Sequence, residues 1–509
     1  MAAPGARAAK GVAMGVGRKL SLIGIPLVFS TAAAQSPQAP DQEIMVAIAD
    51  GARAEALAAA RQESGVTFVR RLPSINAEIW RVRAPNMRDA ITRMTQLPGV
   101  DGAERATGDY RNLFSFDTGQ EDITPEQAAA LSAVRARPEL ADVRVARLRT
   151  GEISQRMLYG GLNFTDSLPV DGSIRLNLAP ETVATVVRRD IRISGPETLL
   201  WSGTVADTKG VALEDAENVA LIVREDRITG TATIGGQTYS IRPLGGGLHA
   251  IARIDYARLP PEHESEEPLV PSEDLPSAQD DAPPPPAAVT LSVGVLVTPE
   301  AERLMRQGGA TPEEFLDLAV LESNQGFDTS HVPVQFTLAG WRAASYSETP
   351  DFASILRALL APADGSLDDV VPWRSSIHAD FVVMIVAANN SCGRAAGFHV
   401  PHDATYAVVS FSCATGNYSF AHEIGHLIGA RHDPDTDAAS TPFAWGHGFR
   451  YRDQWRTIMA YPGGSCGSCP RINAWASPDI KWQDVPMGTP ELNDDARVIR
   501  ENAWRYASS

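Results

Sequence analysis

Residues 43–107 alternate between short apolar runs and helical patterns. The run at 44–48 has the composition of a strand, and the Ala-rich stretch at 52–63 is typical of a helix. Two further strand-like runs surround residues 74–76, and a second helical pattern at 87–96 follows them. The alternation predicts one β-α-β-β-α-β unit.

This order of elements is that of a ferredoxin-like domain, and its pattern resembles the small propeptide domains of subtilisin-like proteases. The resemblance implies that the N-terminal region 35–142 is a ferredoxin-like pro-region rather than part of an enzyme's catalytic core.

Strand-like runs dominate from 143 to 258. Three short segments stand in sequence before His249: Ser-Gly-Thr-Val at 202–205, Ile-Thr-Gly at 228–230 and Tyr-Ser-Ile-Arg-Pro-Leu at 239–244. Their order resembles the prodomain of the adamalysin (reprolysin) metalloproteases. The resemblance implies a β-rich prodomain at 143–258, and a general β-sandwich of unknown role is the alternative.

The pattern stops at residues 259–288, which contain nine prolines, eight acidic residues and no lysine or arginine. Such a segment buries too little apolar surface to offset the entropy of ordering it. We therefore expect an extended acidic, Pro-rich linker, and this is the place where a propeptide would be severed.

Strand-like and helical patterns alternate again from 289 to 509. Strands are predicted at 291–297, 333–338 and 381–386, and helices at 312–324 and 352–360. The fully apolar run at 381–386 suits a buried central strand. The pattern predicts an α/β (α+β) domain with a twisted mixed sheet.

Composition narrows the class of partners. The chain of 509 residues is 44% hydrophobic and 21% charged, which is ordinary for several globular domains. Its net charge of −17 argues against nucleic acid or an anionic membrane as the main partner. Beyond the first 34 residues no apolar run approaches the roughly 20 residues that span a bilayer, so we expect no stable membrane insertion.

The first 34 residues have the features of an export signal. Four basic residues precede an apolar run at 20–29, and the small residues Ser30 to Ala34 follow it. This predicts a secretory signal peptide at 1–34 and a secreted protein, extracellular or periplasmic, after its removal. An N-terminal membrane anchor is the alternative.

The strongest chemical signal is the segment from His422 to His432. On a helix, His422 and His426 project from one face, and Glu423 lies one position round. Gly429 can end the helix with a positive φ, so that His432 completes a three-nitrogen metal site with an open fourth position. The spacing is the extended metzincin signature and predicts one catalytic Zn²⁺. A purely structural zinc site and a histidine-rich helix end are the alternatives.

Three residues after His432 bear on the family. Met459 stands where metzincins carry a methionine turn beneath the zinc histidines, although a methionine in a turn is also common core packing. Asp433, directly after His432, resembles the adamalysin branch. Tyr461 instead resembles astacins and serralysins, in which this tyrosine can approach the metal.

Residues 392–396, Cys-Gly-Arg-Ala-Ala, precede the helix. They resemble the Gly-x-Ala edge strand against which adamalysin substrates lie. The resemblance implies that Gly393, Arg394 and Ala395 form a substrate-binding edge strand and that the protein is similar to a secreted bacterial adamalysin-like zinc peptidase.

The expected reaction is hydrolysis of peptide bonds in polypeptide substrates. Zinc lowers the pKa of bound water, and Glu423 is placed to act as the general base. The Tyr461 hydroxyl is a candidate to share the oxyanion charge, with packing under the site as its alternative. Two other functions compete: a catalytically idle zinc-stabilised binding or adhesion module, and a zinc hydrolase acting on non-protein amides.

All four cysteines lie between 392 and 469. We expect a Cys392–Cys413 disulfide bracing the edge strand and a small Cys466–Cys469 disulfide, with redox activity of the latter pair as the alternative. Because no cysteine precedes Cys392, a latent zymogen needs another cap on the zinc. The propeptide is expected to act as inhibitor and chaperone, through a carboxylate, a histidine such as His249, or steric cover.

Asp433, Asp435 and Asp437 alternate like the start of a calcium loop. Ala438 and Ala444 replace the glycine and glutamate that such a loop requires, so a solvated loop is expected and calcium stays undecided. We interpret His399, His402 and His447 as surface or structural histidines.

Overall fold

The computed structural model describes most of the chain after residue 40. The described residues are 41–49, 51–72, 77–83, 87–105, 112–116, 123–149, 173–194, 198–206, 217–262, 268–273, 287–361, 363–463 and 469–508. The predicted signal peptide at 1–34 lies outside them. Among the described residues, no helix has both the length and the apolar character required to cross a bilayer.

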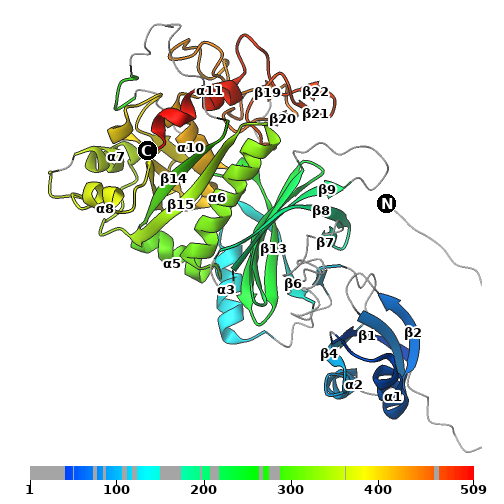
Figure 1. The fold of residues 1–509 in the computed structure, drawn as a ribbon. Coiled ribbons are helices and arrows are strands. Elements are labelled where there is room, and N and C mark those ends of the chain that lie inside the picture. The colour runs from blue at the N-terminus through cyan, green and yellow to red at the C-terminus, as the bar shows by residue number, and fades with distance from the viewer. Residues whose placement is uncertain are drawn as a thin grey trace, which may run out of the picture. The chain divides into compact units, whose positions relative to one another are not determined.

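The first sheet is built from residues 41–105 (Figure 1). Its elements are β1 (Asp41–Ile48), α1 (Ala54–Ser64), β2 (Thr67–Leu72), β3 (Ala77–Arg83), α2 (Met87–Met94) and β4 (Val100–Arg105). The strands stand in the order β2-β3-β1-β4, and each neighbouring pair is antiparallel. Leu57 of α1 and Met94 of α2 bury against Trp80 of β3, so both helices share one core with the sheet.

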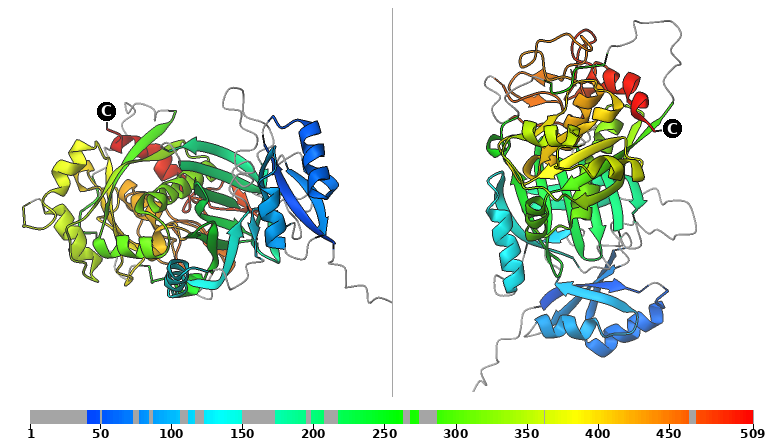
Figure 2. Two further views of the ribbon diagram at one scale, coloured as in Figure 1. Left: turned by 90° about the horizontal axis from the view of Figure 1, so that it is seen from below. Right: turned by 90° about the vertical axis from the view of Figure 1, so that its left-hand side faces the viewer.

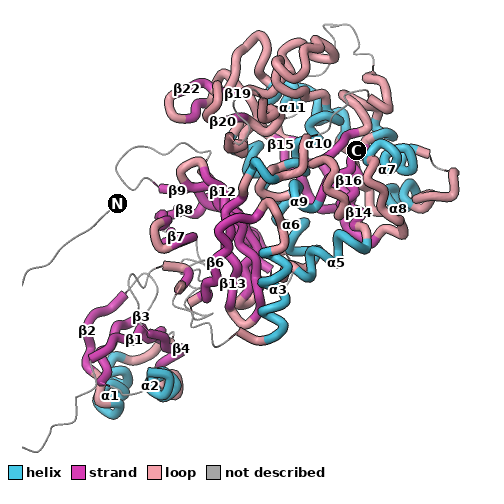
Figure 3. The backbone as a smooth tube through the Cα atoms, turned by 180° about the vertical axis from the view of Figure 1, so that it is seen from behind, coloured by secondary structure: helices cyan, strands magenta, loops and turns pink. Residues whose placement is uncertain are grey.

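The second sheet is antiparallel throughout and has nine strands, in the order β5-β6-β13-β12-β11-β10-β9-β8-β7 (Figure 3). The strands are β5 (Phe114–Ser115), β6 (Leu140–Leu148), β7 (Ser173–Ala179), β8 (Thr182–Ile193), β9 (Thr198–Ala206), β10 (Asn218–Arg224), β11 (Arg227–Ile234), β12 (Gln237–Gly245) and β13 (Leu248–Ile254). Helix α3 (Pro125–Arg135) packs on β6, β12 and β13 (Figure 2), and the 3-10 turn η3 (Tyr256–Arg258) follows the last strand.

The third sheet holds the site. Its order is β15-β14-β16-β18-β17; the first four strands are parallel, and β17 is antiparallel at the edge. The elements up to the site are β14 (Val289–Val297), α5 (Pro299–Gln307), α6 (Pro312–Thr329), β15 (Val334–Ala343), α7 (Phe352–Leu360), α8 (Val370–Ser376), β16 (Phe381–Val386), β17 (Gly393–Ala395), η4 (His402–Ala404), β18 (Tyr406–Ser410), α9 (Phe411–Ala414) and α10 (Ser419–Ile428). The result is the mixed α/β domain that the alternating pattern predicts.

After α10 the chain forms mostly loops, with short pairings and a final helix. These elements are β19 (Arg450–Tyr451), β20 (Trp455–Arg456), β21 (Lys481–Trp482), β22 (Val485–Pro486), α11 (Asp495–Asn502) and η5 (Ala503–Tyr506). Helices α6 and α10 contact each other (Figure 1), and α10 also contacts β17 and β18. The apolar residues of α10 therefore anchor it beside the edge strand.

Helix α6 is buried on nearly every side because its outer face meets the nine-stranded sheet. Leu318 and Leu321 pack against Ala220 and Ile222 of β10. Three polar side chains on this face make hydrogen bonds or ion pairs to the sheet, as burial favours. Glu314 binds Arg227 at 2.8 Å, the amide nitrogen of Gln325 donates to the Val219 carbonyl at 2.8 Å, and Glu322 accepts from the Thr231 hydroxyl.

The acidic segment after residue 258 is docked over much of its described length. The Pro261 carbonyl accepts from the Cys392 amide at 2.9 Å, and the Leu269 amide donates to the Ala396 carbonyl at 2.9 Å. Leu269 and Val270 pack against the core of the third sheet. The expectation of a free extended linker therefore does not hold for 259–262 and 268–273, because two apolar side chains and backbone hydrogen bonds offset the ordering entropy.

Glu322 makes the stability of the interface between α6 and the nine-stranded sheet depend on pH. Burial is the main factor that raises the pKa of Glu322, from 4.5 to about 7, and Thr231 and the Gly416 amide partly oppose it. An acid with a raised native pKa opposes folding increasingly as the pH rises from the unfolded value to the native one, and by a constant amount above it.

We therefore expect Glu322→Gln to stabilise the chain relative to wild type at pH 8, by up to about 3 kcal/mol, and to have little effect at pH 4.5. Urea unfolding of the full chain at both pH values measures this difference. Glu313→Gln, an exposed position on the same helix, is the control. Equal effects of Glu322→Gln at both pH values would refute the prediction.

Candidate metal centre

The centre is built on helix α10 and the turn that ends it. His422 and His426 lie one turn apart on α10, and the helix stops at Gly429, whose φ is 124°. A Cβ atom at Gly429 would come within 2.7 Å of the Phe443 ring, so only glycine fits both this backbone conformation and this space. The chain then turns back and brings His432 to the two helical histidines.

The three imidazoles converge on one point. The Nε2 atom of His426 lies 3.1 Å from that of His422 and 2.9 Å from that of His432, and all three rings are buried. The Nδ1 atoms of His422 and His426 donate to the carbonyls of Ile458 at 2.9 Å and Ala430 at 2.8 Å. These hydrogen bonds fix the tautomer and direct the Nε2 lone pairs inward, which fits a bound metal ion.

Glu423 lies beside the three histidines and is also buried. Burial is the main factor that raises its pKa well above 4.5, followed by repulsion from Glu262, and a cation at the centre would act in the opposite direction. Its Oε2 atom has no hydrogen-bond partner among the described residues. A Cβ atom at Gly393 would lie 2.3 Å from its Oε1 atom, so the glycine of β17 leaves the space that the carboxylate fills.

Met459 and Tyr461 lie on either side of Ala460 in a tight turn. The Ala460 amide donates to the Thr457 carbonyl at 3.1 Å, and Met459 is fully buried. Its Sδ atom would lie 3.1 Å from a Cβ at Gly425 of α10, so the methionine packs closely under the helix. The Tyr461 ring stands over His432, with 3.9 Å between ring centroids.

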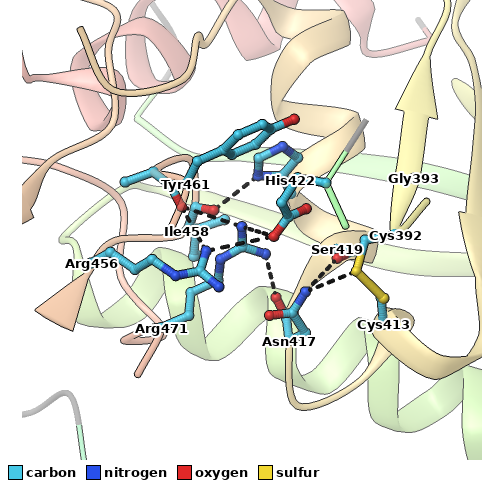
Figure 4. Close-up of polar contacts among 12 residues, drawn as sticks. Cys392, Gly393, Cys413, Asn417, Ser419, His422, Arg456, Ile458, Tyr461 and Arg471 are labelled. Carbon is cyan, nitrogen blue, oxygen red and sulfur yellow. Dashed lines mark hydrogen bonds and ion pairs between the residues drawn. A yellow bond between two sulfur atoms is a disulfide. The ribbon is translucent and has the colours of Figure 1, made fainter. Parts of the chain in front are cut away.

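The predicted edge strand is β17, which contains Gly393, Arg394 and Ala395 and pairs with β18 on one side only. A disulfide joins Cys392 to Cys413, with sulfurs 2.08 Å apart. The amide nitrogen of Asn417 lies 3.4 Å from the Cys392 sulfur and ties the disulfide to the start of α10 (Figure 4). Cys466 lies outside the described residues, so the Cys466–Cys469 disulfide stays a prediction.

His249 is placed away from the metal centre, against the suggestion that it caps the zinc. It is fully buried in β13, its Nε2 atom accepts from the Ile228 amide at 2.9 Å, and its ring packs against Phe114. Burial lowers the pKa of His249 to about 3, so it stays neutral as part of the core of the nine-stranded sheet.

The expectation of a solvated loop at Asp433 to Asp437 is wrong for two of its three acids. Asp433 is buried and accepts from the Tyr461 amide at 3.0 Å, while buried Asp437 binds the Arg431 guanidinium at 2.7 Å. Asp435 is exposed. Alternating acids suggested exposure, but these carboxylates instead brace the methionine turn and the loop after His432.

Two buried arginines beside the centre were not anticipated from the sequence. Arg471 is 0% exposed and Arg456 is 2% exposed, and both donate to the Ala460 carbonyl of the methionine turn. Arg471 also donates to the Asn417 carbonyl at 2.8 Å (Figure 4). Their sequence neighbours, Trp455 and Ile472, were the only signal, since arginines are mostly exposed.

We expect His426→Ala to abolish stoichiometric binding of a divalent metal and to lower the stability of the metal-loaded protein, because a ligand is lost. Glu423→Ala should retain the metal, since its carboxylate lies beside the ligand set rather than in it. Zn²⁺ titration calorimetry and thermal unfolding with and without chelator measure both effects. Metal loss in Glu423→Ala equal to that in His426→Ala would contradict this separation of roles.

Similar proteins bear on the identity of this centre. Residues 310–476 match the reprolysin-type model described as metallo-peptidase family M12. A peptidyl-Asp metalloendopeptidase of Xanthomonas campestris pv. campestris is 34% identical over 378 residues, which cover 73% of this chain and 86% of the relative. The enzyme of the same name from Stenotrophomonas maltophilia is 37% identical over 56% of this chain and 69% of its own length. That from Pseudomonas fragi is 37% identical over 35% of this chain and 92% of its own.

One solved structure, described as a chaperone-substrate complex, aligns with a TM-score of 0.34 at 15% identity over 58% of this chain and 45% of that chain, which is too weak a likeness to carry an argument. The sequence relatives are sufficient for the assignment. The long match to the Xanthomonas enzyme and the family match across the histidine centre agree. The chain belongs to metallopeptidase family M12 and is a reprolysin-like zinc metalloendopeptidase.

Proposed function

We propose that the protein is a secreted zinc endopeptidase, made as a zymogen, whose water nucleophile is activated by Glu423. The observation that supports this is the convergence of three imidazole Nε2 atoms beside a buried carboxylate and an edge strand with one unpaired side. A purely structural zinc site normally closes its fourth position with another protein ligand. Among the described residues, only the three histidines form such a cluster.

His422, His426 and His432 would hold the zinc, and a zinc ion bound there would supply Lewis-acid chemistry, lowering the pKa of a bound water and polarising the scissile carbonyl. The Glu423 carboxylate accepts the proton of the attacking water and later delivers it to the leaving amine. The structure supports this role through the position of Glu423 next to His422 and behind Gly393. Tyr461, which stands over His432, is proposed to donate to the developing oxyanion.

Gly393, Arg394 and Ala395 of β17 are proposed to orient an extended substrate by strand pairing. This favours polypeptides over small amides. The relatives are named peptidyl-Asp metalloendopeptidases, and we propose that this chain likewise acts at aspartyl residues of its substrates.

The regions before the catalytic domain are proposed to be removed. We assign 1–34 as a signal peptide, 35–142 as a ferredoxin-like pro-region, 143–258 as the β-rich prodomain and 259–288 as the connecting segment, with 289–509 as the catalytic domain. The sheet order β2-β3-β1-β4 supports the ferredoxin-like assignment. The prodomain contacts on α6 support a role as folding chaperone and inhibitor.

A catalytically idle binding module is the competing function. It would need the zinc only for stability and would have no use for a buried carboxylate at Glu423. Retaining such a group without a partner for Oε2 is unfavourable unless the group acts on something at the centre.

Digestion of unfolded casein distinguishes the two. We expect the processed protein to degrade casein, 1,10-phenanthroline to stop the reaction and zinc to restore it. Glu423→Ala should keep its zinc and lose at least about 1,000-fold in kcat, since it removes the base and not a ligand. Near-normal proteolysis by Glu423→Ala would show that the proposed mechanism is wrong, and zinc binding without any cleavage would favour the binding module.

A further inference from the structure

We propose that Arg456 and Arg471 form the pocket that recognises an acidic side chain of the substrate. Before processing, Glu262 of the connecting segment 259–288, called the pro-segment below, fills this pocket. The inference rests on the proposed peptidase function and names the residues that would set its specificity and its latency.

The contacts join Glu262 to two arginines that lie about 200 positions later in the sequence. The Nη2 atom of Arg471 donates to Glu262 Oε1 at 2.6 Å, and the Nη1 atom of Arg456 lies 3.6 Å from the same oxygen. The Glu262 side chain is 7% exposed, so the carboxylate is enclosed between the two guanidinium groups. One anion thus bridges two buried cations.

The hydrogen-bond surroundings of the two arginines favour an anion in the pocket. Apart from Glu262, the hydrogen-bond partners of the two guanidinium groups are the neutral carbonyls of Ala460 and Asn417, and the buried acids Asp433 and Glu423 act on Arg456 and Arg471 only through longer-range attraction. The Nε atoms of both arginines have no hydrogen-bond partner among the described residues. Two buried cations with only carbonyl partners are costly, and a carboxylate offsets that cost through charge-assisted hydrogen bonds. When the pro-segment leaves, a substrate carboxylate can take the place of Glu262.

The pocket lies next to the reacting groups. Ala460, to which both arginines donate, stands between Met459 and Tyr461 in the turn under the histidines. Ile458 in the same turn accepts from His422 (Figure 4). A substrate whose acidic side chain enters this pocket would therefore place its backbone near the metal centre and β17.

The pro-segment approaches the edge strand on both flanks of β17. Pro261 pairs with Cys392 before the strand, and the amides of Leu269 and Val270 donate to Ala396 after it, at 2.9 and 3.0 Å. A Cβ atom at Gly397 would lie 2.4 Å from the Val270 carbonyl oxygen, so this glycine permits the close approach. Residues 263–267 lie outside the described part. The segment thus competes with a substrate for both the strand edge and the charged pocket.

Cleavage of matched peptides tests the pocket. For the processed protein, we expect a fluorogenic peptide with one Asp to have kcat/KM at least about 100-fold above its Asn counterpart. Arg471→Gln should reduce this ratio to below about 10-fold because kcat/KM for the Asp peptide falls. Arg452→Gln, at an exposed position, should leave the ratio unchanged. Arg456→Gln repeats the test if Arg471→Gln does not fold. A wild-type ratio near one, or a ratio unchanged in both pocket variants, overturns the pocket.

Peptide binding tests, without requiring catalysis, whether Glu262 of the pro-segment occupies the pocket. A synthetic peptide of residues 256–274 is titrated into processed Glu423→Ala protein, which cannot digest it. Replacing Glu262 by Gln in the peptide should weaken binding at least about 30-fold, and replacing Glu273 less than about 3-fold. Equal weakening by both replacements overturns the role of Glu262. If wild type digests neither casein nor any peptide, the proposed function fails, and this titration still decides whether the arginines recognise an acid.

The activity of the intact, unprocessed chain tests whether Glu262 contributes to latency. Intact Glu262→Gln chain should cleave the Asp peptide at least about 10-fold faster than intact wild type, because its pro-segment no longer holds the pocket. Intact Glu273→Gln chain should match wild type. Equal rates for Glu262→Gln and wild type would show that Glu262 does not contribute to latency.

Discussion

The catalytic half depends on one geometric constraint: three imidazole rings must present their Nε2 atoms to a single point. Two rings come from one face of α10, and the third arrives only because the chain turns back at Gly429. The surrounding residues then fix the rings. Ile458 and Ala430 hold the Nδ1 atoms, and a Cβ at Gly425 would meet the Trp475 ring at 2.7 Å and Met459 Sδ at 3.1 Å. The helix can therefore lie on the methionine turn only because it has glycine at this position.

Whether a feature could be predicted from the sequence depends on how far apart in the chain its interacting residues lie. The histidine spacing is local: positions 422, 426 and 432 follow from helix geometry and one glycine, so the cluster could be inferred before any coordinates. Apolar runs likewise located β14, β16 and α7, because periodicity reports burial directly. The edge strand β17 was instead predicted from the resemblance to adamalysins, because a strand of three residues is too short to show a periodic pattern.

What could not be predicted depends on pairing between distant residues. Arg456 and Arg471 are 15 positions apart, and their shared carboxylate comes from Glu262, about 200 positions earlier. Nothing in the sequence distinguishes that glutamate from the other acids of its segment. The buried carboxylates Asp433 and Asp437 were misjudged for the same reason, because their partners Tyr461 and Arg431 become visible only in the fold. Burial of a charged residue is decided by its partner.

This dependence on partners connects the folding of the chain to its activity. In the intact chain, Glu262 forms ion pairs with both arginines, Glu314 and Glu322 tie α6 to the nine-stranded sheet, and Leu269 and Val270 pack against the core of the third sheet. These contacts stabilise the catalytic domain, and on the proposal above the segment that carries Glu262 also occupies the substrate pocket, so it would both assist folding and hold the enzyme latent. In the proposed zymogen, processing would remove the Glu262 carboxylate and leave two buried cations beside the centre. A substrate acid would gain the binding energy that the pro-segment gave up, whereas a neutral side chain would leave the buried arginines with carbonyl partners only. On this argument, the unfavourable charge state of the processed pocket is the physical source of its preference for an acid.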